Sequence, residues 1–223
     1  MISYASSNDG LTWQYKNTII DEPFHLSYPF VFGHDGEIYM TPECNETSSV
    51  RLYKATRFPG DWEHVETLLS GRRFSDPTLF YYSDRWWMFT ETDPNGTYSR
   101  LCLYHSDNLF SGWCEHPMSP VVENDRTKAR PAGKIRFDDS AIYRFAQDCY
   151  PRYGTRIRAF QITSLTPTYY QEKEIEISSL LSPNGEGWNA KGMHHIDLHK
   201  NPDGLLRAYV DGWNDIMVTS SYR

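Results

Sequence analysis

Two carboxylic acids in the sequence are of the kind that glycoside hydrolysis uses. Asp76 stands directly before Pro77, and Glu43 ends an apolar segment. A glycosidase needs one carboxyl group that donates a proton and a second that acts as base or nucleophile. We therefore expect Asp76 and Glu43 to form the catalytic pair if the chain is an enzyme. The alternative for each is a structural carboxylate that accepts hydrogen bonds from neighbouring backbone.

An arginine and a histidine-rich segment supply further polar groups. Arg130 could bind sugar hydroxyls, a carboxylate or a phosphate through paired hydrogen bonds, or it could neutralise Asp76 or Asp148. In the segment 194–199, alternate residues share one face of a strand, but three ligands on a straight strand spread over about 13 Å. A channel wall or one acid–base histidine is therefore favoured over a metal site. The expected substrate-binding residues are Tyr28, Arg130, Asp148, His194, His195 and Asp197.

The elements that must position these residues form a repeated pattern. A dipeptide ending in Pro, or a His pair, opens an apolar strand, a turn-rich tip follows, and a second strand ends on a carboxylate. The four copies open at Tyr28, Asp76, Arg130 and His194, which by subtraction lie 48, 54 and 64 residues apart. Repeats of short strands at such intervals are typical of a β-propeller. Because the first strand of each blade lines the channel of a propeller, we expect the four openings to converge on one polar pocket.

The repeats predict one all-β domain over residues 1–223, with an incomplete N-terminal blade. We assign residues 1–22 to the partial blade, and the successive blades span 23–70, 71–124, 125–182 and 183–223. The segment 2–20 looks like the third and fourth strands of a blade, and the last repeat has two strands followed only by 216–221. Two closures stay open. The N-terminal strands could complete the last blade in a four-bladed ring, or they could be the remnant of a fifth blade in an open ring.

Composition excludes some functions. The net charge of −7 argues against a nucleic-acid partner, since nucleic-acid binders usually carry a basic patch. No apolar run approaches the roughly 18–20 residues that span a bilayer, and no signal segment begins at Met1, so we expect a cytoplasmic protein with a truncated N-terminus.

Cys102 and Cys114 could form a disulfide across a hairpin, but free thiols are favoured. Nothing in the sequence indicates an oligomeric state.

Several motifs together resemble a known family. They are His25–Phe32, Asp76-Pro77-Thr78-Leu79-Phe80, Arg130-Pro131-Ala132-Gly133, Ala146-Gln147-Asp148-Cys149 and Gly192–Asp197. They are similar to the domain at the N-terminus of plant glucosamine inositolphosphorylceramide transferases and in related bacterial proteins. That domain is similar in turn to the five-bladed propellers of glycoside hydrolase family 43 and of the arabinanase, levansucrase and invertase group. The resemblance implies a five-bladed propeller and a carbohydrate ligand.

The catalytic pattern of the hydrolases is matched only in part. Family-43-like hydrolases use a base in the first blade, a pKa-tuning Asp in the third and a proton-donating Glu in the fourth. Asp76 matches the tuning Asp, Arg130 stands near the place of the acid, and the base has no counterpart. Glu43-Cys44 is similar to the Glu-Cys acid motif of the invertase group but precedes the Asp-Pro motif.

Two functions therefore remain open. The chain is either a hydrolase-like propeller that handles a sugar in its channel, or a non-catalytic carbohydrate-binding or scaffolding propeller. No cofactor is expected, and a channel-bound calcium or other ion stays an alternative.

Overall fold

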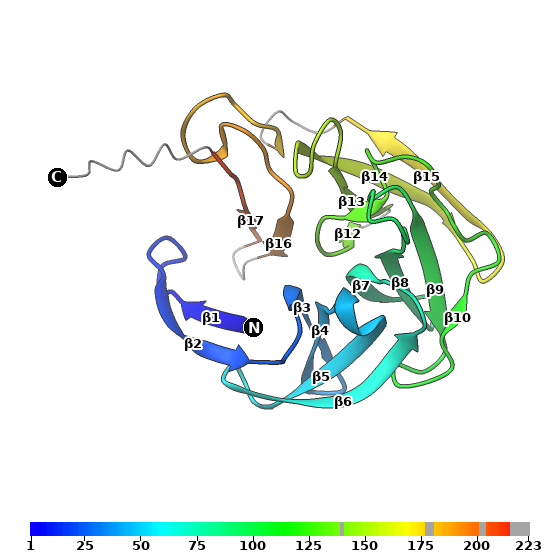
Figure 1. The fold of residues 1–223 in the computed structure, drawn as a ribbon, viewed down its shortest axis with the longest axis horizontal. Coiled ribbons are helices and arrows are strands. Elements are labelled where there is room, and N and C mark those ends of the chain that lie inside the picture. Colours follow the sequence, from blue (N-terminus) through cyan, green and yellow to red (C-terminus); the bar gives the residue numbers. More distant parts are fainter. Residues whose placement is uncertain (139–140, 177–180, 201–203, 215–223) are drawn as a thin grey trace.

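The computed structural model describes residues 1–138, 141–176, 181–200 and 204–214, and its strands are set in sheets around a central opening (Figure 1). The 3₁₀ segments Asn45–Thr47 and Gly187–Asn189 lie between strands. No helix in the described ranges has the length and apolar character that crossing a lipid bilayer requires.

The strands of the described ranges form five antiparallel sheets. The first sheet contains β1 (Ile2–Ser6) and β2 (Gln14–Ile20). The second has the order β3 (Ser27–His34), β4 (Glu37–Glu43), β5 (Ser49–Arg57) and β6 (Asp61–Ser70). The third has the order β7 (Ser75–Tyr82), β8 (Arg85–Glu91), β9 (Leu101–Ser106) and β10 (Cys114–Glu115).

Two further sheets complete the series. The fourth contains β11 (Arg130–Pro131), β12 (Arg136–Asp138), β13 (Ala141–Asp148), β14 (Arg156–Leu165) and β15 (Tyr170–Ile175), with β11 and β12 both paired to β13. The fifth contains β16 (Ile196–Lys200) and β17 (Leu206–Val210). The all-β propeller predicted from the repeats is thus the observed fold.

The first two complete repeats have the same register. Ser27 pairs with Glu43 in one sheet, and Ser75 pairs with Glu91 in the next. In both, the register shifts directly after the serine, at the residue that precedes Pro. The turn at Asp35-Gly36 has positive φ at both residues, as a tight two-residue hairpin requires. The repeat in the sequence is therefore a repeat of strand pairing.

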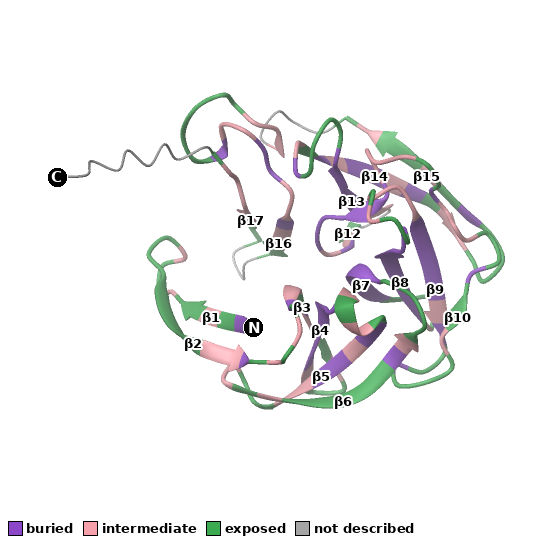
Figure 2. Cartoon of the chain, in the orientation of Figure 1, coloured by how far each residue is buried: buried purple, intermediate pink, exposed green. Residues whose placement is uncertain are grey.

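Apolar side chains pack between neighbouring sheets. Figure 2 shows the buried stretches of the strands in purple. Between the second and third sheets, Leu52, Phe74 and Met88 are almost completely buried. Between the third and fourth, Trp87 and Phe89 have the same role. This packing fixes the angle between blades, and so it fixes where their inner strands meet.

The first and last sheets remain separate in the described residues. No strand pairing joins β17 to β1 there, although the rings of Trp13 and Tyr209 lie edge to face at 5.7 Å between centroids. The described strands thus do not form the four-stranded last blade of the first closure, and the predicted strand over 216–221 lies outside the described residues. All four cysteines, Cys102 and Cys114 included, are free thiols.

Candidate functional site

The openings of four repeats meet at one cavity of about 380 Å³. Tyr28 comes from β3, Asp76 from β7 and Arg130 from β11, while His194 and His195 directly precede β16. The full lining is Ser27, Tyr28, Pro29, Asp76, Arg130, Gln147, Tyr153, His194, His195 and Asp211. Residues that are more than 160 positions apart in the chain therefore face one small volume, which we call the central pocket.

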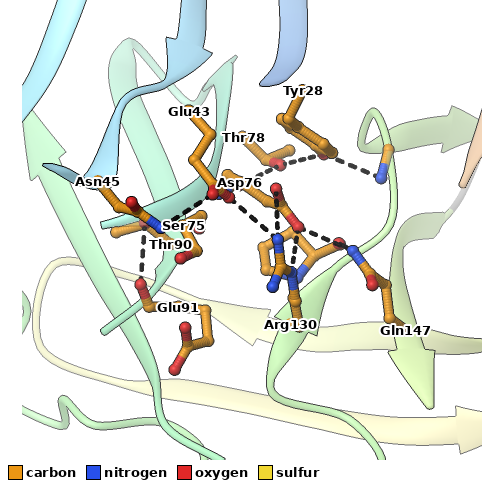
Figure 3. A network of polar contacts seen from close by, with 12 residues as sticks. Tyr28, Glu43, Asn45, Ser75, Asp76, Thr78, Thr90, Glu91, Arg130 and Gln147 are labelled. Atoms are coloured by element: carbon orange, nitrogen blue, oxygen red, sulfur yellow. Dashed lines mark hydrogen bonds and ion pairs between the residues drawn. The ribbon is translucent and has the colours of Figure 1, made fainter. Parts of the chain in front are cut away.

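A buried ion cluster forms one side of the central pocket (Figure 3). Arg130 Nε donates to Asp76 Oδ2 at 2.6 Å, and its Nη2 reaches Asp76 Oδ1 at 3.3 Å and Glu43 Oε2 at 3.0 Å. Gln147 Nε2 adds a bond to Asp76 Oδ2 at 2.8 Å. Both oxygens of Asp76 are therefore occupied by donors, and one guanidinium serves two carboxylates.

Two of the opening residues, Tyr28 and Asp76, have an unusual backbone conformation directly before a proline. Tyr28 has φ of 46° and Asp76 has φ of 51°, a left-handed conformation that non-glycine residues rarely adopt. Tyr28 uses this position to bridge blades, because its hydroxyl lies 2.8 Å from Thr78 Oγ1 and accepts the Gly133 N–H at 2.9 Å. Such conformations persist only where the surroundings over-determine them, and they cluster at functional sites.

Aromatic rings enclose the cationic side of the central pocket. The guanidinium carbon of Arg130 lies 4.8 Å from the ring centroid of Tyr98 and 5.0 Å from that of Tyr153. His194 packs against Tyr153 at 5.1 Å, and His195 meets Tyr28 edge to face at 5.3 Å. These rings hold the polar groups in place and offer flat surfaces to a ligand.

The two histidines share one carboxylate. Asp211 Oδ1 accepts the backbone N–H of His194 at 3.0 Å and that of His195 at 2.6 Å, and Asp211 Oδ2 contacts the ring nitrogen Nδ1 of His194. Burial opposes ionisation of Asp211, but the bonds from His194 hold its pKa below the ordinary value. Asp211 therefore fixes the two histidines at the edge of the central pocket.

Burial and charge shift the protonation of the ion cluster. Burial, and then the charge of Asp76, raise the pKa of Glu43 to about 8. Burial acts against the charged form of Arg130, but Asp76 outweighs it and raises the pKa of Arg130 above its ordinary value. Burial also lowers the pKa of His195, which favours its neutral imidazole. At neutral pH the cluster thus combines a guanidinium with a carboxyl group, Glu43, that tends to be neutral.

The structure places the remaining predicted residues outside the central pocket. Glu43 lies behind Asp76 and is 4% exposed. Asp197 lines a neighbouring cavity of about 240 Å³ with Lys134, which lies 3.5 Å from it. Asp148 accepts bonds from Arg156 and Arg158, at 3.0 and 3.1 Å, and does not line the pocket.

Three other residues of the lining were not among the expected binding residues. Gln147 and Tyr153 belong to the polar and aromatic stretch 147–154, which the sequence marks as a candidate substrate loop without distinguishing one residue from its neighbours. Asp211 could have been found as the carboxylate that ends the fourth copy of the repeat. Among the described residues, no group of three or more His, Cys, Asp or Glu side chains is arranged to hold a metal ion.

The fold is shared with solved enzymes at low sequence identity. A GH43 protein of Bacillus licheniformis, BlXynB, aligns with a TM-score of 0.58 and 13% identity over 84% of this chain and 37% of its own. An exo-β-1,3-galactanase of Phanerochaete chrysosporium, solved with β-1,3-galactotriose, aligns with a TM-score of 0.57 and 10% identity over 84% and 44%. At these identities the likeness concerns the fold alone.

Sequence relatives are more similar. The glucosamine inositolphosphorylceramide transferase 1 of Oryza sativa subsp. japonica is 33% identical over 212 residues, and that of Arabidopsis thaliana is 34% identical over 218. The matches cover 93% and 95% of this chain, and the chain spans 28% of each relative's length. The model of one family matches residues 2–213. Because this match covers nearly the whole chain, the chain belongs to the family "Glucosamine inositolphosphorylceramide transferase 1, N-terminal".

Proposed function

We propose that the chain binds a carbohydrate in the central pocket without hydrolysing it. The pocket combines hydrogen-bonding groups with the rings of Tyr28 and Tyr153, which is the mixture that a sugar's hydroxyl groups and apolar ring faces require. Solved proteins with the same fold are described as complexes with xylotriose and with β-1,3-galactotriose. The proposal concerns the matched segment and not the transfer reaction in the relatives' names.

The observation that carries this proposal is the position of Arg130 between the two acids. A glycosidase needs one free acid and one free base on either side of the scissile bond. Here both oxygens of Asp76 accept hydrogen bonds from Arg130, and Glu43 lies behind Asp76, outside the pocket lining. Asp211, the other carboxylate in the lining, is held by His194. These acids are better placed to orient hydroxyl groups than to transfer protons.

Titration calorimetry with xylose, xylotriose, β-1,3-galactotriose and glucosamine tests the proposal. We expect at least one of these sugars to bind, and Asp76→Asn to weaken it by about tenfold or more because Asp76 faces the pocket. Asp61→Asn, at an exposed ion pair of another blade, is the matched control and should leave the affinity unchanged. If none of the four sugars binds, or if Asp76→Asn binds as tightly as the wild type, the proposal is wrong.

Hydrolysis by Asp76 and Glu43 is the second candidate. The raised pKa of Glu43 favours it, because a carboxyl group that stays protonated near neutral pH can donate a proton to a leaving group. Release of monosaccharide from xylotriose or β-1,3-galactotriose, abolished by both Asp76→Asn and Glu43→Gln, would favour this reaction over binding alone. We expect no release.

A further inference from the structure

The backbone N–H of Asp76 has an unusual partner. Because Asp76 adopts a left-handed conformation at the register shift of β7, it stands outside the regular ladder of pairs with β8. Its N–H points instead to Glu43 Oε2, 3.1 Å away on the neighbouring blade. A side chain of one blade thus accepts a backbone hydrogen bond that the strand pairing of the next blade leaves unformed.

Glu43 also holds the cation of the cluster. Its Oε2 accepts Nη2 of Arg130 at 3.0 Å, and its Oε1 accepts Asn45 Nδ2 at 3.0 Å. The side chain is almost fully buried and lines no part of the central pocket. Glu43 therefore contacts both the backbone of Asp76 and the guanidinium that face the ligand, without facing it itself (Figure 3).

We infer that Glu43 is a positioning residue, which holds Asp76 in its left-handed conformation and Arg130 in register so that both point into the central pocket. The expected effect of Glu43 on sugar affinity rests on the proposed function, but its expected effect on the conformation of Asp76 does not. Glu43 needs only an oxygen acceptor at this place, whereas a proton donor would need a carboxyl group.

Glu91 provides a matched control within the same fold. It pairs with Ser75 as Glu43 pairs with Ser27, and it is also buried at the end of a second strand. Its Oε1 accepts the N–H of Asp93 at 2.6 Å, in its own blade, and it does not line the pocket. The two glutamates have the same place in the repeat but only Glu43 reaches a residue of the central pocket.

The first experiment needs no ligand and follows the Asp76 amide by NMR. The groups that face Glu43 are Asp76, Arg130 and Asn45, and Glu91 and Tyr153 lie around Arg130 as further titratable groups. In the wild type we expect the Asp76 amide resonance to titrate between about pH 6 and pH 10 as Glu43 ionises. Glu43→Gln should remove this step while the amide keeps a hydrogen-bonded shift, and Glu91→Gln should leave the step in place.

The second experiment measures binding of whichever sugar of the four binds the wild type. Glu43→Ala should weaken binding by about tenfold, and Glu43→Gln should restore it to within about threefold of the wild type. The amide oxygen of the glutamine can accept from Asp76 and Arg130, while its NH₂ donates to Asn45 after the asparagine amide turns over. Glu91→Ala should leave the affinity unchanged.

The outcomes are separable. Persistence of the Asp76 titration step in Glu43→Gln, or equal losses of affinity in Glu43→Gln and Glu43→Ala, overturns the positioning role. Equal losses in Glu91→Ala and Glu43→Ala also overturn it, because the effect would then be common to buried carboxyl groups. If Glu43→Ala does not fold, the NMR comparison of Glu43→Gln with the wild type decides alone. A correct NMR result without binding of any sugar would overturn the proposed function and leave the positioning of Asp76 intact.

Discussion

Two arginines of this protein are buried among similar neighbours but differ in what surrounds their charge. Arg144 is 1% exposed, lies 4.6 Å from the ring centroid of Phe160, and donates from Nε and Nη2 to the two oxygens of Glu172 at 2.8 and 2.7 Å. Arg130 is 8% exposed, lies between two tyrosine rings, and serves two carboxylates at the wall of a cavity. Arg144 is paired with one carboxylate, whereas Arg130 is paired with two, those of Asp76 and Glu43.

The difference separates a structural ion pair from a cluster suited to function. Arg144 and Glu172 balance each other, and the remaining nitrogen Nη1 donates to the Lys128 carbonyl oxygen at 3.0 Å. Around Arg130, burial and then the charge of Asp76 raise the pKa of Glu43, and the single guanidinium does not offset them. Perturbed groups at a cavity wall indicate a functional site, whereas an ion pair whose two charges balance is explained by its structural role.

The largest expected effect comes from breaking the matched pair. Arg144→Met leaves Glu172, whose side chain is only 12% exposed, without its cation, and we expect the free energy of unfolding to fall by about 3–5 kcal/mol in urea denaturation. Sugar binding in the variant at low temperature should match the wild type. The double variant Arg144→Met/Glu172→Met should recover most of the loss, because no unpaired charge remains. A double variant as unstable as the single one would contradict this explanation.

The corresponding change at the pocket should affect both properties. Arg130→Met leaves two carboxyl groups without their cation, so it should reduce stability and also abolish detectable sugar binding. Calorimetric binding and urea denaturation on the same samples measure the two effects. If Arg130→Met still bound sugar as the wild type does, Arg130 would be a structural residue like Arg144 and not part of the binding site.

The pH dependence of stability should have opposite signs in the two regions. Burial raises the pKa of Glu43 to about 8 and that of Glu91 to about 7, so the folded state binds more protons than the unfolded state. Stability should therefore fall by several kcal/mol as pH rises from about 4.5 to about 8, because a pKa difference of one between folded and unfolded states corresponds to about 1.4 kcal/mol for each group. Urea denaturation across this range measures it, and Glu43→Gln/Glu91→Gln should flatten the fall.

Glu172 supplies the reverse case. Burial opposes its ionisation, but Arg144 lowers its pKa below the ordinary value of 4.5. Its contribution is present above the unfolded-state pKa and is lost as pH falls through the folded-state pKa. Glu172→Gln should therefore weaken the acid dependence and leave the fall between about pH 4.5 and 8 in place. If Glu172→Gln flattened the fall between about pH 4.5 and 8, and Glu43→Gln/Glu91→Gln weakened the acid dependence, this explanation would be wrong.

A smaller effect should follow from the bridge at the pocket wall. Tyr28→Phe removes the hydroxyl between Thr78 and Gly133 and leaves the Gly133 N–H without its acceptor. We expect a loss of about 1–2 kcal/mol in the free energy of unfolding. Tyr81→Phe, on an exposed ring, is the control and should change stability by less than about 0.5 kcal/mol. Equal changes in the two variants would mean that the bridge contributes nothing.

The smallest effect should come from an ion pair open to solvent. The Arg156 side chain is 46% exposed, and Asp148 keeps Arg158 when Arg156 is removed. Arg156→Ala should therefore reduce the free energy of unfolding by less than about 1 kcal/mol and leave sugar binding unchanged. A loss as large as that of Arg144→Met would show that burial does not decide the value of these pairs.

The sequence predicts the inner strands of the repeat better than the outer ones. Each opening motif is short and starts a strand, so the meeting of Tyr28, Asp76, Arg130 and His194 follows from the propeller geometry alone. The sequence also offered Arg130 as the counter-charge of either Asp76 or Asp148, and the structure shows the pair with Asp76.

The sequence pattern could not predict which arginine pairs with which carboxylate when several are possible. Asp148 ends a second strand as Glu43 does, but Arg156 and Arg158 on β14 share one face and bind its carboxylate. The pattern of first and second strands contains no information about this third strand. Arg144 and Glu172 were missed for the same reason, because their contact depends on strands that the opening motifs do not mark.

The bond between Glu43 and Arg130 joins residues 87 positions apart, and the bond between Tyr28 and Gly133 joins residues 105 apart. Contacts of such long sequence separation close large loops, and chains that depend on them fold slowly. The hairpins of single blades can form early, but the complete lining of the central pocket exists only once four blades have docked. Ligand binding should therefore be the last property to return during refolding, after strand content and after burial of Trp86 and Trp87.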